Sequence, residues 1–216
     1  MKNVMFIHVP KAAGSSIEVA LGLIKARTVG KFDRLFIGKG RYSFGHICVT
    51  KRIKNGAIPK DFYESAFKFC FCRNPFDRAV SHYHYARLYH SKPVRGHMAF
   101  PKTVSFDEFT RTLGNYKKMF QQQHLYTDGI KFDFIGRFEN LYSDLEYVSN
   151  KTGIQLNMIH KNSTQHEPYW TYYTEETAQN VAEFYKRDFE IFGYDNNLYN
   201  NPVISKNVTI TNKQRV

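Results

Sequence analysis

The chain has 216 residues, of which 42% are hydrophobic and 16% aromatic, so it can build a packed core and does not have the composition of a disordered protein. Its formal net charge of +12 indicates an anionic partner but does not say whether that is a nucleotide, a polyanion or a membrane. Three cysteines argue against a disulfide framework, and we expect Cys70 and Cys72 to be buried structural thiols.

The first third of the chain predicts a strand, a tight loop and a helix. The apolar run at 4–9 suits a buried parallel strand, and apolar residues at helical spacing place a helix start near Ser15 or Ser16. Residues 25–41 are basic and contain glycine, which predicts a loop, and 42–49 predicts a short strand.

A second strand and helix follow the same order. Residues 67–72 are almost wholly apolar and predict a buried strand. Asn74 suits an N-cap and Pro75 the first helical position, so we expect a helix from there to about residue 89.

The last part of the chain contains further predicted elements. We expect short helices at 106–113 and 117–126, a third strand at 132–138, and helices at 141–151 and 174–189.

Alternating strands and helices predict an α/β fold with a P-loop-like, mostly parallel sheet flanked by helices on both faces. We expect a single domain over residues 1–194 and a polar, loosely attached tail over 195–216. The apolar run at the N-terminus is too short to span a membrane and lacks a signal-peptide pattern, so we expect a cytoplasmic protein without a membrane span.

The loop after the first strand has the composition of a phosphate-binding loop. Small residues before a helix N-terminus let backbone N–H groups face an anion, and Lys11 adds a cation. The candidate binding residues are Lys11, Ala12, Ala13, Gly14, Ser15 and Ser16. The loop is not a Walker A motif, because the Gly-Lys-Ser/Thr ending is missing. An ordinary strand-to-helix turn remains an alternative.

The end of the second strand carries a second candidate phosphate site. Arg73 offers a planar guanidinium and Ser81, eight residues later, offers a hydroxyl donor. The alternative is a structural arginine that pairs with Asp77.

Both segments together resemble a known family. The sequence from His8 to Ser16 (HVPKAAGSS) and that from Arg73 to Ser81 (RNPFDRAVS) are similar in order and spacing to sulfotransferases that use 3′-phosphoadenosine 5′-phosphosulfate (PAPS). The likeness is greatest to the carbohydrate-type branch, which includes heparan sulfate 2-O-sulfotransferase and bacterial relatives. It extends more weakly over residues 3–194.

This resemblance implies roles for individual residues. The first segment would hold the 5′-phosphosulfate, and Arg73 with Ser81 would hold the 3′-phosphate. Lys11 would stabilise the leaving oxygen, and no metal would be needed. His46 follows Gly45, as the general base does in the 2-O-sulfotransferases, although Phe44 stands where that family has a second histidine.

The sequence therefore predicts an enzyme that transfers a sulfuryl group from PAPS to a hydroxyl acceptor. We expect the acceptor to be an oligosaccharide or other glycan, which an anionic substituent would suit, and no nucleic-acid partner. A cytoplasmic protein of bacterial or viral type fits the missing anchor. The alternatives are a non-catalytic polyanion-binding protein and, less favoured, a P-loop small-molecule kinase.

Other histidines have less specific interpretations. We expect His8 to face the core or the nucleotide, and His82 and His84 to lie at the surface or a cleft rim. The aromatic segment 169–173 is a candidate adenine wall, with a core position as the alternative.

Overall fold

The structure, a computed structural model, describes residues 3–22, 35–38, 41–45, 58–89, 99–116, 120–156 and 167–200. The strands are β1 (Val4–His8), β2 (Leu35–Gly38), β3 (Arg41–Gly45), β4 (Phe67–Cys72) and β5 (Phe134–Arg137). The α-helices are α1 (Gly14–Ala20), α3 (Lys60–Ser65), α4 (Pro75–Tyr89), α5 (Phe106–Thr112), α6 (His124–Thr127), α7 (Leu141–Thr152), α8 (Glu175–Phe184) and α9 (Lys186–Phe192). Short 3₁₀ turns are η1 (Leu113–Tyr116), η2 (Phe138–Asn140), η3 (Tyr169–Tyr172) and η4 (Leu198–Asn200).

The contacts within the chain group into two compact units. The first consists of Met1–Arg73 and Gln123–Ser163, and the second of Asn74–Gln122 and Thr164–Val216. Each unit contains two separate segments of the sequence, so neither unit is formed by one continuous stretch of the chain.

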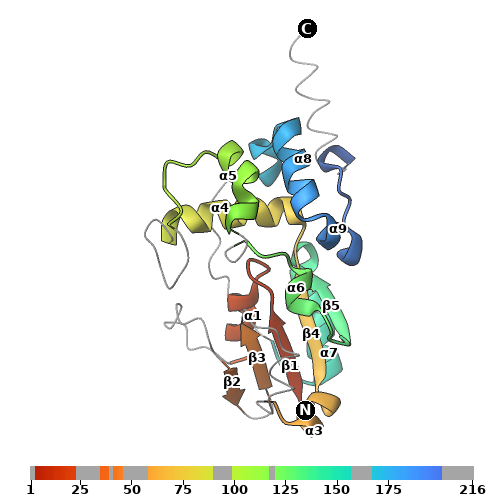
Figure 1. The fold of residues 1–216 in the computed structure, drawn as a ribbon. Helices are drawn as coiled ribbons and strands as arrows, with labels where there is room; N and C mark the ends of the chain where they lie inside the picture. The colour runs from red at the N-terminus through yellow and green to blue at the C-terminus, as the bar shows by residue number, and fades with distance from the viewer. Residues whose placement is uncertain are drawn as a thin grey trace. The chain divides into compact units, whose positions relative to one another are not determined.

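The first unit contains a sheet of five strands in the order β2-β3-β1-β4-β5 (Figure 1). The pairs β3-β1, β1-β4 and β4-β5 are parallel, and only β2 runs antiparallel to its neighbour β3. The α/β class with a mostly parallel sheet is therefore confirmed. The carboxyl ends of β1, β3 and β4 lie along one edge, which is where α/β proteins bind ligands.

The centre of the sheet is apolar because β1 and β4 are covered on both faces. Met5 and Phe6 point to opposite faces, and both are fully buried. On one face Phe6 packs against Phe69, with ring centroids 5.1 Å apart. Burial on both faces explains why the sequence of these strands shows continuous apolar runs instead of alternation.

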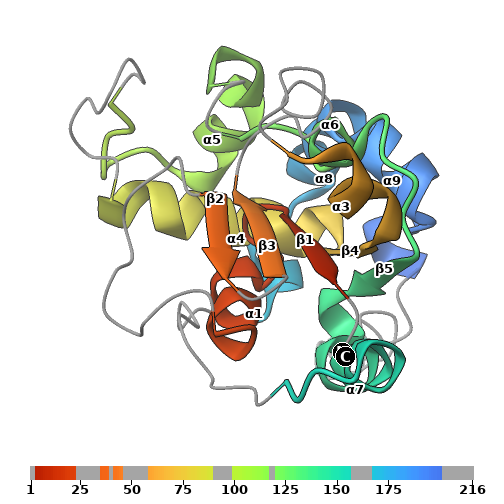
Figure 2. The ribbon, with the colours of Figure 1, turned by 90° about the horizontal axis from the view of Figure 1, so that it is seen from below.

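Helices of the first unit lie on both sides of this sheet (Figure 2). On one side are α1 and α7, and the ring of Tyr147 on α7 packs 4.7 Å from that of Phe134 on β5. On the other side is α3, where the Lys68 ammonium group donates to the carbonyl of Tyr63 at 3.0 Å. The flanking helices thus agree with the predicted fold.

Cys70 and Cys72 are buried side by side on β4, as expected. Burial, and secondarily the neighbouring Cys72, raises the pKa of the Cys70 thiol well above its usual value. Cys72 Sγ lies 3.4 Å from the carbonyl oxygen of Gly136. A thiol with a raised pKa in an apolar core is unreactive, which agrees with a structural role for Cys70.

The second unit is built from helices around an aromatic core. Helix α4 begins at Pro75 as predicted, and Asn74 Oδ1 accepts a hydrogen bond from the amide of Phe76 at 2.9 Å. The core side chains of this unit include Phe76, Tyr83, Phe100, Phe106, Phe109, Phe120, Val181, Tyr185 and Phe189. Tyr169, Trp170, Tyr172 and Tyr173 are partly buried and pack against this core. Tyr173 donates to the carbonyl of Phe76 at 2.7 Å.

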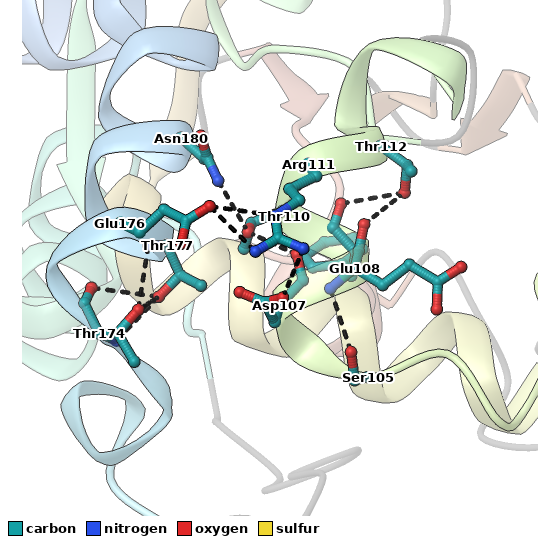
Figure 3. Close-up of polar contacts among 11 residues, drawn as sticks. Ser105, Asp107, Glu108, Thr110, Arg111, Thr112, Thr174, Glu176, Thr177 and Asn180 are labelled. Carbon is teal, nitrogen blue, oxygen red and sulfur yellow. Dashed lines mark hydrogen bonds and ion pairs between the residues drawn. The ribbon is translucent and has the colours of Figure 1, made fainter.

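Polar contacts join α5 to α8 at the surface of the second unit (Figure 3). Arg111 bridges Asp107 and Glu176, each with N–O distances of 3.0 Å. Thr174 caps α8 through a reciprocal pair of bonds with Thr177. Exposed ion pairs contribute only about 0–1 kcal/mol, so this network adds little to the stability of the second unit.

Several predicted elements differ from the structure. The expected loop at 25–41 contains β2, which pairs with β3 and whose three apolar residues are too few to predict a strand. The predicted helix at 117–126 is wrong over 120–123, which are not helical. The predicted helix at 174–189 is two helices, α8 and α9, that meet at Tyr185. Tyr185 is fully buried and donates to the carbonyl of Phe120 at 3.0 Å.

The prediction for His82 is also wrong, because its side chain is only 4% exposed and packs against the Phe120 ring. His84 is half-buried against the Tyr172 ring. The predicted polar tail falls mostly outside the described residues, and within them Leu198 is buried in the core of the second unit.

Candidate active site

The loop between β1 and α1 has an unusual backbone. Lys11 and Ala13 both have left-handed backbone angles, with φ of 68° and 62°, although neither is glycine. Residues without glycine's freedom adopt this region at an energetic cost and concentrate at functional sites. Turns of this kind aim successive N–H groups into a concavity that suits an anion.

The start of α1 determines which amides of the loop bond to carbonyl groups of the loop itself. The amide of Ala12 donates to the Val9 carbonyl at 3.4 Å, and that of Ser16 donates to the Ala13 carbonyl at 2.9 Å. The amides of Gly14 and Ser15 stand at the first positions of α1, where a helix offers no intrahelical acceptor. Of the predicted binding residues, Lys11 and Ser15 are half-buried, whereas Ser16 is buried.

The His8 side chain packs against this loop and contacts α1. Its Nδ1 lies 2.9 Å from Oε1 of Glu18 on α1, and both side chains are nearly buried. A Cβ atom on Gly14 would come within 2.1 Å of the His8 ring. The glycine therefore lets the loop rest directly on the imidazole.

Arg73 lies at the end of β4 and contacts the loop. Its Nη1 donates to the carbonyl oxygen of Lys11 at 3.2 Å, and its guanidinium stacks on the Phe138 ring at 4.0 Å. The side chain is only 9% exposed. The fold thus brings the two sequence segments together at Lys11 and Arg73, because they follow the adjacent parallel strands β1 and β4.

The structure also shows two partners of Arg73 that sequence reasoning missed. Gln123 bonds both the amide and the carbonyl of Arg73, each at 2.9 Å, and Phe138 provides the stacking surface. Of these two residues, only Phe138 lies in a segment with a recognisable sequence pattern, that of a strand followed by a helix. Gln123 carries no motif, and it lies in a stretch that the sequence predicted to be helical.

Two predicted site residues are not placed with the others. Ser81 lies on α4 in the second unit, where its side chain is buried. His46 lies outside the described residues, directly after Gly45, the last residue of β3. Gly45 pairs with His8 in the parallel register of β3 and β1.

Among the residues that the structure describes, no three His, Cys, Asp or Glu side chains gather in a way that could hold a metal ion.

None of the helices in the described part of the chain combines the length and the hydropathy of a membrane-spanning segment.

The fold and the loop define the class of this protein: it is an α/β protein with a P-loop-like strand, loop and helix. Comparison with known proteins identifies the family within that class. Residues 1–195 match the model of the sulfotransferase family, so the chain belongs to that family and has its sulfuryl-transfer chemistry. It is also 29% identical over 103 residues to an uncharacterized protein of Archaeoglobus fulgidus, covering 45% of this chain and 76% of the archaeal protein. No solved structure matches the chain significantly.

The contact between Gly14 and His8 predicts a steric coupling. We expect Gly14→Ala to lower the free energy of unfolding by about 1–3 kcal/mol, the usual cost of overpacking. In a His8→Ala background the same change should cost much less, because the clash is gone. Denaturant unfolding of the single and double variants measures this. Gly114→Ala is the matched control, since a Cβ there would meet nothing within 4 Å. Equal costs in both backgrounds would contradict the contact.

Proposed function

We propose that this protein transfers a sulfuryl group from PAPS to a hydroxyl of a carbohydrate acceptor. The observation that carries the proposal is the hydrogen bond between Arg73 and the Lys11 carbonyl. It joins the two segments that, in the family the sequence resembles, bind the two phosphate ends of this nucleotide. A donor with phosphate groups at both its 3′ and 5′ positions would suit such a pair of sites.

The phosphate loop would bind the 5′ end of the donor. The amides of Gly14 and Ser15, at the first positions of α1, and the Ser15 hydroxyl would hold the 5′-phosphate, helped by the positive end of the helix dipole. Arg73 would hold the 3′-phosphate through its planar fork of donors. Ser81 is a second candidate ligand for the 3′-phosphate, on the sequence pattern alone.

Lys11 would stabilise the charge that develops during transfer. The acceptor oxygen forms a bond to sulfur while the bond from sulfur to the bridging oxygen breaks, and adenosine 3′,5′-bisphosphate leaves. The ammonium group of Lys11, on a loop already fixed by its backbone, would neutralise the bridging oxygen as it becomes an anion. The residues proposed for this step require no metal.

His46 is the proposed general base that removes the acceptor's proton. Gly45 ends β3 beside His8, the last residue of β1, so residue 46 follows a strand end next to the phosphate loop. An imidazole with a near-neutral pKa suits this role.

The acceptor is proposed to be a glycan, and the net charge of +12 would suit an anionic one. Arg87, in the last turn of α4, is engaged in contacts within the second unit. Its Nε donates to the Lys102 carbonyl at 2.9 Å, and its Nη1 donates to the Tyr83 hydroxyl at 3.0 Å. The other basic residues between Arg87 and Lys102 lie outside the described part of the chain.

Calorimetric binding of adenosine 3′,5′-bisphosphate without Mg²⁺ tests the donor. We expect binding that weakens at least about tenfold for AMP, because one charge-assisted phosphate contact is lost. Arg73→Ala should abolish this preference. A preference for Mg²⁺–ATP would favour a kinase. Binding of polyanions with a steep salt dependence and no nucleotide binding would favour a non-catalytic polyanion binder.

Lys11→Ala should lower turnover by about two to three orders of magnitude, the usual effect of removing one group that stabilises a transition-state anion. Adenosine 3′,5′-bisphosphate should still bind, and the melting temperature should be unchanged. The measurement is transfer of a ³⁵S-labelled sulfuryl group to a panel of glycans, with Lys60→Ala on the exposed face of α3 as the control. Wild-type turnover in Lys11→Ala would remove this residue from the mechanism.

His46→Asn should lower kcat by about 10²–10⁴-fold, the typical contribution of a general base, while the affinity for adenosine 3′,5′-bisphosphate stays at the wild-type value. The acid limb of the kcat profile against pH should also disappear. An unchanged limb would assign the base to another residue.

A further inference from the structure

Gln123 makes an unusual contact with the backbone of Arg73. Its side chain is fully buried. The Arg73 amide donates to Oε1 of Gln123, and Nε2 of Gln123 donates to the Arg73 carbonyl, both at 2.9 Å. One side-chain amide thus satisfies both polar groups of a single backbone residue.

This contact replaces a strand partner at the end of β4. The β4-β5 register ends with Cys72 opposite Arg137, so Arg73 is the first residue beyond the paired part of the strand. Buried backbone donors and acceptors must find partners. The Gln123 amide supplies one acceptor and one donor, the two kinds of partner that a neighbouring strand would offer.

The consequence is that Arg73 is held at both its ends. Gln123 fixes its backbone, while the Phe138 ring and the Lys11 carbonyl fix its guanidinium at 4.0 Å and 3.2 Å. A guanidinium at the end of a flexible stem lies in one place only if the backbone that carries it is also fixed. Without Gln123, the residue after Cys72 would lose the partners that determine its direction.

We propose that Gln123 is a positioning residue of the nucleotide site, which aims Arg73 at the phosphate loop and at the 3′-phosphate. This inference rests on the proposed function, because it assumes that Arg73 recognises that phosphate. It assigns a role to a residue outside both sequence segments, which acts on the ligand only through Arg73.

The chemistry requires glutamine at this position. Glutamate retains the length and an acceptor for the Arg73 amide, but as a carboxylate it cannot donate to the Arg73 carbonyl. Asparagine is one methylene too short to keep both bonds without movement of the backbone. Methionine has similar volume and makes neither hydrogen bond.

The test is the ratio of the dissociation constants for AMP and adenosine 3′,5′-bisphosphate, measured by calorimetry on the full chain. In Gln123→Met we expect this ratio to fall by about tenfold or more, since the main 3′-phosphate contact is misplaced. The matched control is Thr152→Val, which removes the buried hydrogen bond from Thr152 Oγ1 to the Val148 carbonyl, 2.7 Å long and within α7. It should lower stability but leave the ratio unchanged.

A double-mutant cycle separates positioning from general stability. In an Arg73→Ala background, Gln123→Met should still lower the melting temperature but should change the ratio no further. If Gln123→Met does not fold, Gln123→Glu takes its place and should lower the ratio in the same direction.

Two results would overturn the inference in distinguishable ways. A wild-type protein that does not prefer the bisphosphate would refute the proposed function and this inference with it. A wild-type preference that persists in the folded Gln123 variants would refute only the role of Gln123.

Discussion

The site depends on the hydrogen bond from Arg73 to the carbonyl oxygen of Lys11. Lys11 and Ala13 hold left-handed backbone angles, each costing about 1–2 kcal/mol for a residue with a Cβ atom. Such a loop persists only if its surroundings fix it. A charged donor on one of its carbonyl groups is a strong constraint, because hydrogen bonds to ionised groups are roughly twice as strong as neutral ones.

The second constraint on the loop comes from the imidazole beneath it. His8 ends β1 and its ring occupies the space that a side chain at residue 14 would need. Glu18, one turn into α1, fixes that ring through Nδ1. The strand end, the loop and the helix start are thereby tied together within eleven residues. A carboxylate is costly to bury alone, but here it has a hydrogen-bonded partner.

The sheet explains why these residues meet at all. β1 and β4 are adjacent and parallel, so the residues that follow them emerge at the same edge. Both strands are almost completely buried. Their burial fixes the positions from which the Lys11 loop and Arg73 begin, so the two residues can stay in contact. The same core keeps Cys70 protonated and unreactive. Rigid elements below and shaped loops above are the usual arrangement in α/β enzymes.

The sequence by itself determined the elements with strong local signals. The apolar run of β4 and the Asn74-Pro75 start of α4 were predicted correctly, since burial on both faces and helix capping are encoded within a few residues. The sequence also predicted that the Lys11 and Arg73 segments follow strands of one mostly parallel sheet. The role of His46 and the partnership of Arg73 with Ser81 stay predictions.

Only the tertiary structure decided the features that depend on distant partners. Helices α8 and α9 meet at Tyr185, whose buried hydroxyl donates to the carbonyl of Phe120, whereas the sequence pattern predicted one continuous helix. Gln123 is not helical, although the sequence predicted a helix there, and it bonds to the backbone of Arg73, 50 residues away in the sequence. Such contacts have no local sequence signal, because the free energy that fixes them comes from groups that meet only after the chain has folded.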